Sequence, residues 1–302
     1  METIKKINLI SRGLSEVKYD IIKFPDGETH IKFSEELDRK QAYTVICRIT
    51  NAEDLWILMQ VGHILNTVKV VWDLKILYLM SMRMDRIISF RECFTLDLVA
   101  SMINSLKPYC VYVLHPHSSR TIMLINNCQT LDGFSPSIAD TEDKIYNPRA
   151  GMGKTAICYP DKGACDRYTM DQGFTWRGVV NEPAVITLKK VRDLETGNIK
   201  SIEVDNITGL AENEVPTVIT VVDDLCDAGG TFIGAAKLLR EKFPSAEINI
   251  FVRHAVNPIG VINLSENYDK VYLTNSYSSF DGLHIPMNKV VVCDVVSEIS
   301  KL

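Results

Sequence analysis

"VITVVDDLCDAGGTFIGAAKLLRE", residues 218–241, combines an apolar run, a polar loop and an amphipathic segment. The β-branched run from Val218 to Val222 is typical of a strand that is buried on both faces, and Asp223 and Asp224 follow it directly. From Thr231 onward, apolar residues recur at helical spacing. Open α/β sheets bind ligands at the carboxyl ends of their strands, so the stretch predicts a binding loop between a strand and a helix.

The residues of this loop indicate the chemistry of the ligand. Gly229 and Gly230 let backbone amides approach closely, and the helix N-terminus adds positive potential, so the loop suits a phosphate. Asp223 and Asp224 would repel that phosphate unless they bind something else, such as vicinal sugar hydroxyls or a metal ion. A phosphorylated ribose offers both features. The alternative is that the aspartates cap a helix and the glycines form an ordinary turn.

Length and composition limit the classes of protein. The chain has 302 residues, 46% of them hydrophobic, which is enough for two domain cores. The net charge of −5 without a basic run argues against nucleic acid as the main partner, and no apolar run approaches the ~20 residues of a membrane span. The eight cysteines show no CxxC pair and no zinc-type spacing, which predicts reduced thiols in a cytoplasmic protein.

Strand-like and helical segments alternate along the chain and predict two α/β units in tandem. We expect strands at residues 43–49, 69–80, 110–115, 155–160, 184–190, 217–224, 247–254 and 270–275, and helices at 52–67, 95–106 and after 231. Turn-forming and polar residues at 132–153 mark a boundary. We therefore assign residues 1–140 to an N-terminal domain and residues 141–302 to a C-terminal domain.

Several motifs carry a family resemblance. "VVDDLCDAGGT" resembles the phosphoribosyl-diphosphate loop that phosphoribosyltransferases share with ribose-phosphate diphosphokinases. The loop alone does not choose between them. Five further segments are similar to diphosphokinase motifs and occur in family order over nearly the whole chain: "FPDGE" at 24–28, "RMDR" at 83–86, "HPHS" at 115–118, "PDKGACDR" at 160–167 and "KKVRD" at 189–193. The set favours the diphosphokinases.

The resemblance implies a fold and a reaction. The fold would be two tandem phosphoribosyltransferase-like (Rossmann-like) α/β domains with mainly parallel sheets and an active site between them. ATP and ribose 5-phosphate would give phosphoribosyl diphosphate and AMP, with Mg²⁺ as cofactor and Mn²⁺ as an alternative. The N-terminal domain would bind ATP and metal, and the C-terminal domain ribose 5-phosphate. A homo-oligomer is expected, because in the family the "FPDGE" segment reaches the ATP site of a neighbouring subunit.

The resemblance also implies roles for individual residues. The catalytic residues would be Lys190 and Arg192. Ribose 5-phosphate would be bound by Asp223, Asp224, Asp227, Ala228, Gly229, Gly230 and Thr231. ATP would be bound by Phe24, Asp26, Glu28, Arg83, Met84, Asp85 and Arg86. The metal would be bound by His117, Asp161 and His115.

Three departures from the family pattern keep other interpretations open. His115 stands where the family has an acid, Ala228 stands where it often has threonine, and "IISF" at 87–90 stands where it commonly has charges. Because Mg²⁺ prefers oxygen ligands, an imidazole at 115 implies a metal site that is either altered or bridged by water. A catalytically silent regulatory homologue is one alternative. A phosphoribosyltransferase that uses a nucleobase is another, although it would leave the "FPDGE", "RMDR" and "HPHS" resemblances unexplained.

Overall fold

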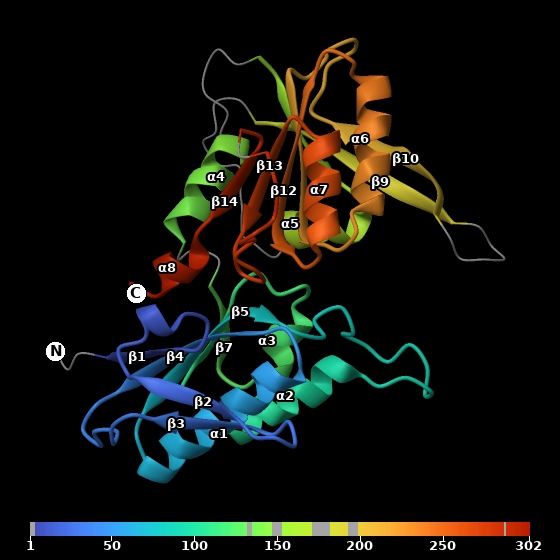
Figure 1. Cartoon of the computed structure of the whole chain (residues 1–302). Helices are drawn as coiled ribbons and strands as arrows, with labels where there is room; N and C mark the ends of the chain where they lie inside the picture. Colours follow the sequence, from blue (N-terminus) through green and yellow to red (C-terminus); the bar gives the residue numbers. More distant parts are fainter. Residues whose placement is uncertain (1–3, 132–134, 147–152, 171–181, 193–198, 287) are drawn as a thin grey trace. The chain divides into compact units, whose positions relative to one another are not determined.

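The computed structural model describes residues 4–131, 135–146, 153–170, 182–192, 199–286 and 288–302. It divides into two compact units, the first of residues 1–135 and 295–302, the second of residues 136–294. Each unit contains one mainly parallel β-sheet, and helices pack on it (Figure 1). The expected α/β class with two tandem domains is confirmed.

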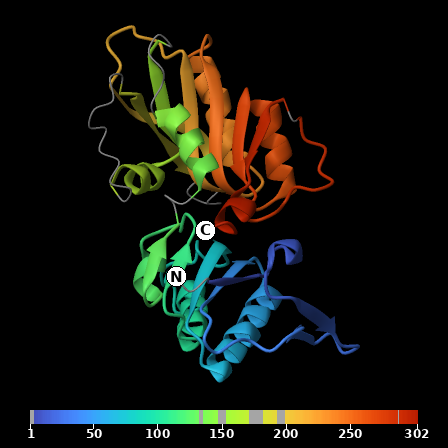
Figure 2. The ribbon, with the colours of Figure 1, turned by 90° about the vertical axis from the view of Figure 1, so that its left-hand side faces the viewer.

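The first unit is built on a parallel five-stranded sheet in the order β1-β4-β5-β6-β7. Its strands are β1 (Lys5–Asn8), β4 (Tyr43–Ile49), β5 (Trp72–Leu79), β6 (Val111–Val113) and β7 (Cys128–Thr130). A separate antiparallel hairpin consists of β2 (Tyr19–Lys23) and β3 (Thr29–Phe33) and is visible in blue in Figure 2. The helical segments are η1 (Arg12–Leu14), α1 (Ala52–Val68), α2 (Thr95–Ser105), α3 (Arg120–Leu124) and α8 (Val295–Ile299).

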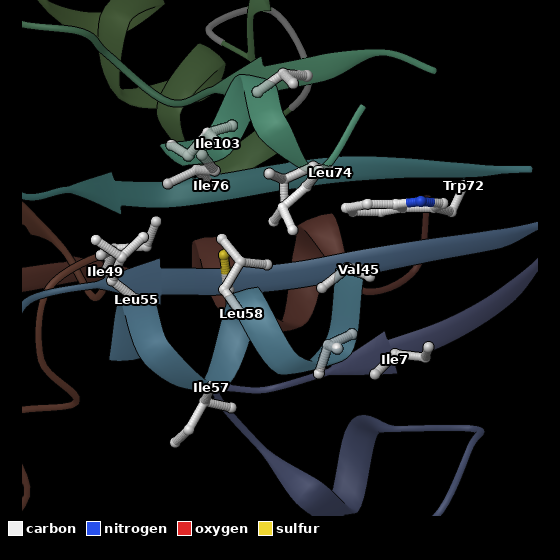
Figure 3. Packing of buried hydrophobic residues seen from close by; sticks show 14 of the residues in the cluster. Ile7, Val45, Ile49, Leu55, Ile57, Leu58, Trp72, Leu74, Ile76 and Ile103 are labelled. Carbon is white, nitrogen blue, oxygen red and sulfur yellow. The ribbon is translucent and has the colours of Figure 1, made fainter. Parts of the chain in front are cut away.

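The core of this unit forms where α1 packs on the sheet. Val45 of β4, Leu74 of β5 and Leu58 of α1 are fully buried and converge in Figure 3. Burial of one such side chain stabilises the fold by about 1.5–3 kcal/mol. The side chain of Asn51 caps α1 by accepting hydrogen bonds from the amides of Glu53 and Asp54.

The second unit is built on a seven-stranded sheet in the order β10-β9-β8-β11-β12-β13-β14. Its strands are β8 (Thr155–Tyr159), β9 (Ala184–Arg192), β10 (Ile199–Thr208), β11 (Val218–Cys226), β12 (Glu247–Ala255), β13 (Lys270–Thr274) and β14 (Val290–Cys293). Only β10 is antiparallel to its neighbour. The helices are α4 (Pro136–Tyr146), α5 (Lys162–Met170), α6 (Gly230–Lys242) and α7 (Pro258–Asn267). In Figure 1, α4 lies on one side of this sheet and α6 and α7 on the other.

The observed division differs from the sequence-based boundary in two places. Residues 136–140 begin α4 and group with the second unit, where Glu142 forms an ion pair of 2.6 Å with the buried Arg253 of β12. Residues 295–302 return to the first unit, where Nδ2 of Asn8 donates a 2.7 Å hydrogen bond to Oγ of Ser300. Both differences involve contacts between residues far apart in the chain.

Candidate active site

The predicted phosphate loop connects β11 to α6. Gly229 lies at the N-cap of α6 with φ of 85°, a left-handed conformation that favours glycine. Asp227, Ala228 and Gly230 are exposed, so the loop is open to ligand. Because α6 is 13 residues long and begins at Gly230, its first amides and its dipole present a site for an anion.

Two asparagine side chains at helix α7 donate hydrogen bonds to this loop. Nδ2 of Asn257 donates to Oδ1 of Asp227 at 3.1 Å, and Nδ2 of Asn263 donates to the carbonyl oxygen of Ala228 at 2.8 Å. A Cβ atom at Gly260 would lie only 1.8 Å from the carbonyl oxygen of Asp227, so glycine is required for this close approach. These residues of α7 were not predicted from the sequence. Asn257 followed by Pro258 is an N-cap signal that could have placed the start of α7, but not its contact with the loop.

The two aspartates near the carboxyl end of β11 contact an arginine from the "PDKGACDR" segment. Nη1 of Arg167 lies 3.4 Å from Oδ1 of Asp223 and forms a shorter contact with Oδ1 of Asp224. Burial, and then the charge of Asp224, raises the pKa of Asp223 well above its usual range. Burial by itself would lower the pKa of Arg167, but Asp224 and other neighbouring groups raise it overall. From the sequence, Arg167 was assigned only to the "PDKGACDR" motif, and its pairing with the two aspartates was not predicted.

Asp161 of the same segment pairs with the predicted catalytic lysine. Its Oδ1 accepts a 2.9 Å hydrogen bond from the amide of Ala164 and so caps α5, while its Oδ2 accepts a 2.9 Å bond from Nζ of Lys190. Burial alone would raise the pKa of Asp161, but the Ala164 amide, Lys190 and Arg167 lower it. The carboxylate of Asp161 is therefore ionised at neutral pH and oriented by two donors.

These contacts lie at the carboxyl ends of neighbouring strands in the second sheet. Strands β9, β8 and β11 are parallel neighbours, and Lys190, Asp161 and Asp224 lie at or just after their carboxyl ends. The second unit thus brings together residues from three of the sequence motifs. Arg192 ends β9, but its side chain lies outside the described residues.

The predicted ATP residues of the first unit lie on two separate segments. Arg83, Met84, Asp85 and Arg86 follow β5, where the Met84 carbonyl accepts a bond from the Leu96 amide of α2. Nε of Arg86 lies 3.8 Å from Oδ1 of Asp85, and the Arg86 side chain is 76% exposed. The exposed guanidinium of Arg86 is therefore accessible to a phosphate.

Phe24, Asp26 and Glu28 form the turn of the β2–β3 hairpin. Gly27 has φ of 91°, and the amide of Phe24 donates to the carbonyl of Glu28 at 2.8 Å. Asp26 uses Oδ1 to accept the Glu28 amide at 3.1 Å, which stiffens the turn. Phe24 is 44% exposed, so its ring face can receive another group.

His115 and His117 follow β6. His115 is buried and has φ of 42°, while His117 is half-buried. Among the described residues, no three His, Cys, Asp or Glu side chains converge as a metal site. A Mg²⁺ ion at His117 or Asp161 would need further oxygen ligands from substrate phosphates and water, which is the usual arrangement for this ion. The accessible histidine is therefore His117, whereas His115 is better placed to support the loop.

Neither unit contains, in its described residues, a helix long and apolar enough to span a membrane. No disulfide joins any of the cysteines. A glycine-containing loop at the carboxyl end of a parallel sheet, preceded by paired acids, is the arrangement of a phosphoribosyltransferase-like α/β fold. A solved phosphoribosylpyrophosphate synthetase from Mycobacterium smegmatis shares the fold, with a TM-score of 0.74 at 15% identity over 99% of this chain and 97% of that chain.

Curated relatives confirm the resemblance that the motifs indicate. A ribose-phosphate pyrophosphokinase from Pyrococcus abyssi is 26% identical over 275 residues, which are 88% of this chain and 87% of that protein. Proteins of the same name from Pyrococcus furiosus and Ureaplasma parvum are 24% and 25% identical over 94% and 83% of this chain, and over 91% and 71% of their own lengths. No family model matches the chain. The chain is thus similar to ribose-phosphate pyrophosphokinases along most of its length.

Proposed function

We propose that the protein transfers the diphosphoryl group of ATP to the C1 hydroxyl of ribose 5-phosphate, giving phosphoribosyl diphosphate and AMP. The observation that carries the proposal is the grouping of Lys190, Asp161, Arg167 and the two loop acids at the carboxyl ends of three neighbouring strands. The named relatives point to the same reaction.

The ribose 5-phosphate would bind first to the second unit. Its 5-phosphate would accept hydrogen bonds from amides between Asp227 and Thr231, and its 2- and 3-hydroxyls would donate to Asp223 and Asp224. Asp223 and Asp224 are already neutralised in part by Arg167, so hydroxyl groups can approach them without a second cation. This arrangement would leave the C1 hydroxyl without a protein contact and available for reaction.

The C1 oxygen would then attack the β-phosphorus of ATP, and AMP would leave. Such transfers depend on positioning and charge neutralisation more than on covalent catalysis. Lys190, with Arg192 beside it in the chain, would stabilise the charge that develops on the transferred group. ATP would enter as its Mg²⁺ complex, with Mn²⁺ as an alternative ion, and Asp161 and His117 would face that substrate ion.

The adenine end of ATP would lie against Phe24, with Asp26 and Glu28 as acceptors for the amino group, and Arg83 and Arg86 would contact phosphates. The enzyme would be cytoplasmic, and in a homo-oligomer its ATP site would be shared between subunits. His115 and Met84 would support their loops.

The test is to incubate the purified protein with ATP, ribose 5-phosphate and Mg²⁺ and to separate the products. AMP should appear in step with phosphoribosyl diphosphate. Release of ADP, or turnover that requires a nucleobase, would contradict the proposal and favour a different transferase. Ligand binding without turnover would favour the regulatory homologue, for which the departures at His115 and Ala228 are the motivating observations.

A further inference from the structure

An arginine that belongs to none of the sequence motifs lies inside the second unit. Arg253 is part of β12, and none of its side chain is exposed. Nη2 of Arg253 donates a 2.6 Å hydrogen bond to Oε1 of Glu142 on α4, whose side chain is only 11% exposed. Because a buried charge is costly unless it is paired, this contact restricts the positions of both side chains.

Two aromatic rings contact the guanidinium of Arg253. Its central carbon lies 4.1 Å from the ring centroid of Phe251 and 4.5 Å from that of Tyr168 on α5. The Tyr168 ring also stacks on Tyr159 at the end of β8, with the ring centroids 6.0 Å apart and an angle of 7° between the ring planes. Cation–π contacts at such distances are attractive, and they are stronger in a buried site than at the surface. The Tyr168 ring is therefore fixed by a cation and by a second ring.

Tyr168 connects this buried pair to the candidate site. It follows Arg167 directly on α5, and the guanidinium carbon of Arg167 lies 5.9 Å from the centroid of the Tyr168 ring. The other end of the Arg167 side chain contacts Asp223 and Asp224. The orientation of the arginine toward the two acids therefore depends on where the Tyr168 ring is held.

The strand register brings Arg253 close to the same acids. Strands β11 and β12 pair Asp223 with Val252, so the next residue, Asp224, lies opposite Arg253. Side chains at directly paired positions point to the same face of a sheet. Arg167 from α5 and Arg253 from β12 are thus both on the face of the sheet that carries Asp224.

We call Glu142, Arg253 and Tyr168 the buried stack, and we propose that these three are positioning residues, which hold Arg167 on the two acids of β11. Without the stack, the last turn of α5 would lose its support on the sheet, and Arg167 would no longer be directed at the acids. Asp223 and Asp224 would then lack their cation and repel each other. The pair would bind sugar hydroxyls less well.

A double-mutant cycle in urea unfolding tests the positioning without any ligand. Arg167→Gln, Asp224→Asn and their combination give the coupling free energy between the two side chains, and the cycle is repeated in a Tyr168→Leu background. We expect the coupling in that background to fall below half of its wild-type value. Tyr168→Phe retains the ring and should retain the coupling.

Two further backgrounds make this cycle decisive. Glu142→Leu combined with Arg253→Met removes both buried charges and leaves neither unpaired, so it should fold and should lower the coupling as Tyr168→Leu does. Phe243→Leu is the matched control for general destabilisation, because Phe243 is a buried ring at the far end of α6. Wild-type coupling near zero, or equal coupling in the wild-type, stack-variant and control backgrounds, would overturn the inference.

The effect on ligand binding is the part of the inference that rests on the proposed function. In a calorimetric titration with ribose 5-phosphate, Tyr168→Leu should raise Kd about tenfold, whereas Tyr168→Phe and Phe243→Leu should change it less than about twofold. An unchanged Kd in Tyr168→Leu would overturn the claim that the buried stack acts on this ligand. A wild type that does not bind ribose 5-phosphate would refute the proposed function, and a loss of coupling in the cycle would still support the positioning role.

Discussion

Replacement of Gly260 by alanine should disrupt the phosphate loop without touching any predicted ligand-binding side chain. The new Cβ would lie 1.8 Å from the carbonyl oxygen of Asp227, and 3.1 Å from the carbonyl carbon of Asp227 and from Sγ of Cys226. An ordinary contact begins at 3.4 Å, so the loop and α7 must separate by about 1.6 Å. Because the clashing atom is backbone, no rotamer change relieves the contact.

The displacement sets the size of the expected effect. A misplacement of about 1 Å in a positioned group can cost about 100-fold in rate, or ~2.7 kcal/mol. Since the loop would bind the 5-phosphate before reaction, most of the loss should appear as a higher KM for ribose 5-phosphate. Overpacking should also lower the free energy of unfolding by about 1–3 kcal/mol.

Two measurements separate loop displacement from general destabilisation. Steady-state kinetics gives KM for ribose 5-phosphate and for ATP, and calorimetric titration with ribose 5-phosphate gives Kd without turnover. Gly13→Ala is the control, because its Cβ would meet only Oγ of Ser11 at 3.9 Å. If Gly260→Ala retained the wild-type Kd and KM for ribose 5-phosphate, the argument that α7 positions the loop would be wrong.

The remaining predictions concern side chains of the candidate site. Lys190→Ala should lower kcat on the order of 100-fold with little change in KM, whereas Lys189→Ala, at a half-exposed position, should retain activity. Asp224→Ala should instead raise the Kd for ribose 5-phosphate in a calorimetric titration. Because burial and the charge of Asp224 raise the folded-state pKa of Asp223, stability is lost as pH rises above the ordinary value of 3.8, so Asp223→Asn should raise Tm more at neutral pH than at about pH 4. Because His115 is buried and is proposed to support its loop, His115→Asp should leave the Mg²⁺ concentration for half-maximal activity and the relative advantage of Mn²⁺ unchanged; a lower Mg²⁺ requirement would place His115 in the metal site.

Patterns local in sequence were predicted well, because they depend on short-range periodicity. Helix α1 was expected at 52–67 and spans Ala52–Val68, and the β11–loop–α6 unit lies where the aspartates and glycines of residues 218–241 placed it. The loop geometry follows from Gly229, since few other residues adopt φ of 85° without strain.

Long-range pairings could not be predicted in the same way. Arg167 and Asp224 are 57 residues apart, and Glu142 and Arg253 are 111 apart, so no local pattern relates them. They meet only because parallel strands bring their carboxyl ends to one edge and because α4 packs on the second sheet. The requirement for glycine at position 260 could not be predicted for the same reason, because it depends on how closely α7 approaches the loop.

The ion pairs of the second unit bear on how a charged substrate could enter. Lys190 and Asp161 neutralise each other at 2.9 Å, with Lys190 22% exposed, and separating them without replacement would leave two partly buried charges unpaired. On the proposed function, a magnesium–nucleotide complex supplies both replacements: its phosphates are anions for Lys190, and its cation suits Asp161. Arg167 stays with Asp223 and Asp224 throughout, because ribose hydroxyls are neutral and require no exchange of charge. The site would therefore admit the metal complex of ATP more readily than the free nucleotide, because free ATP would break the pair and leave Asp161 facing a phosphate.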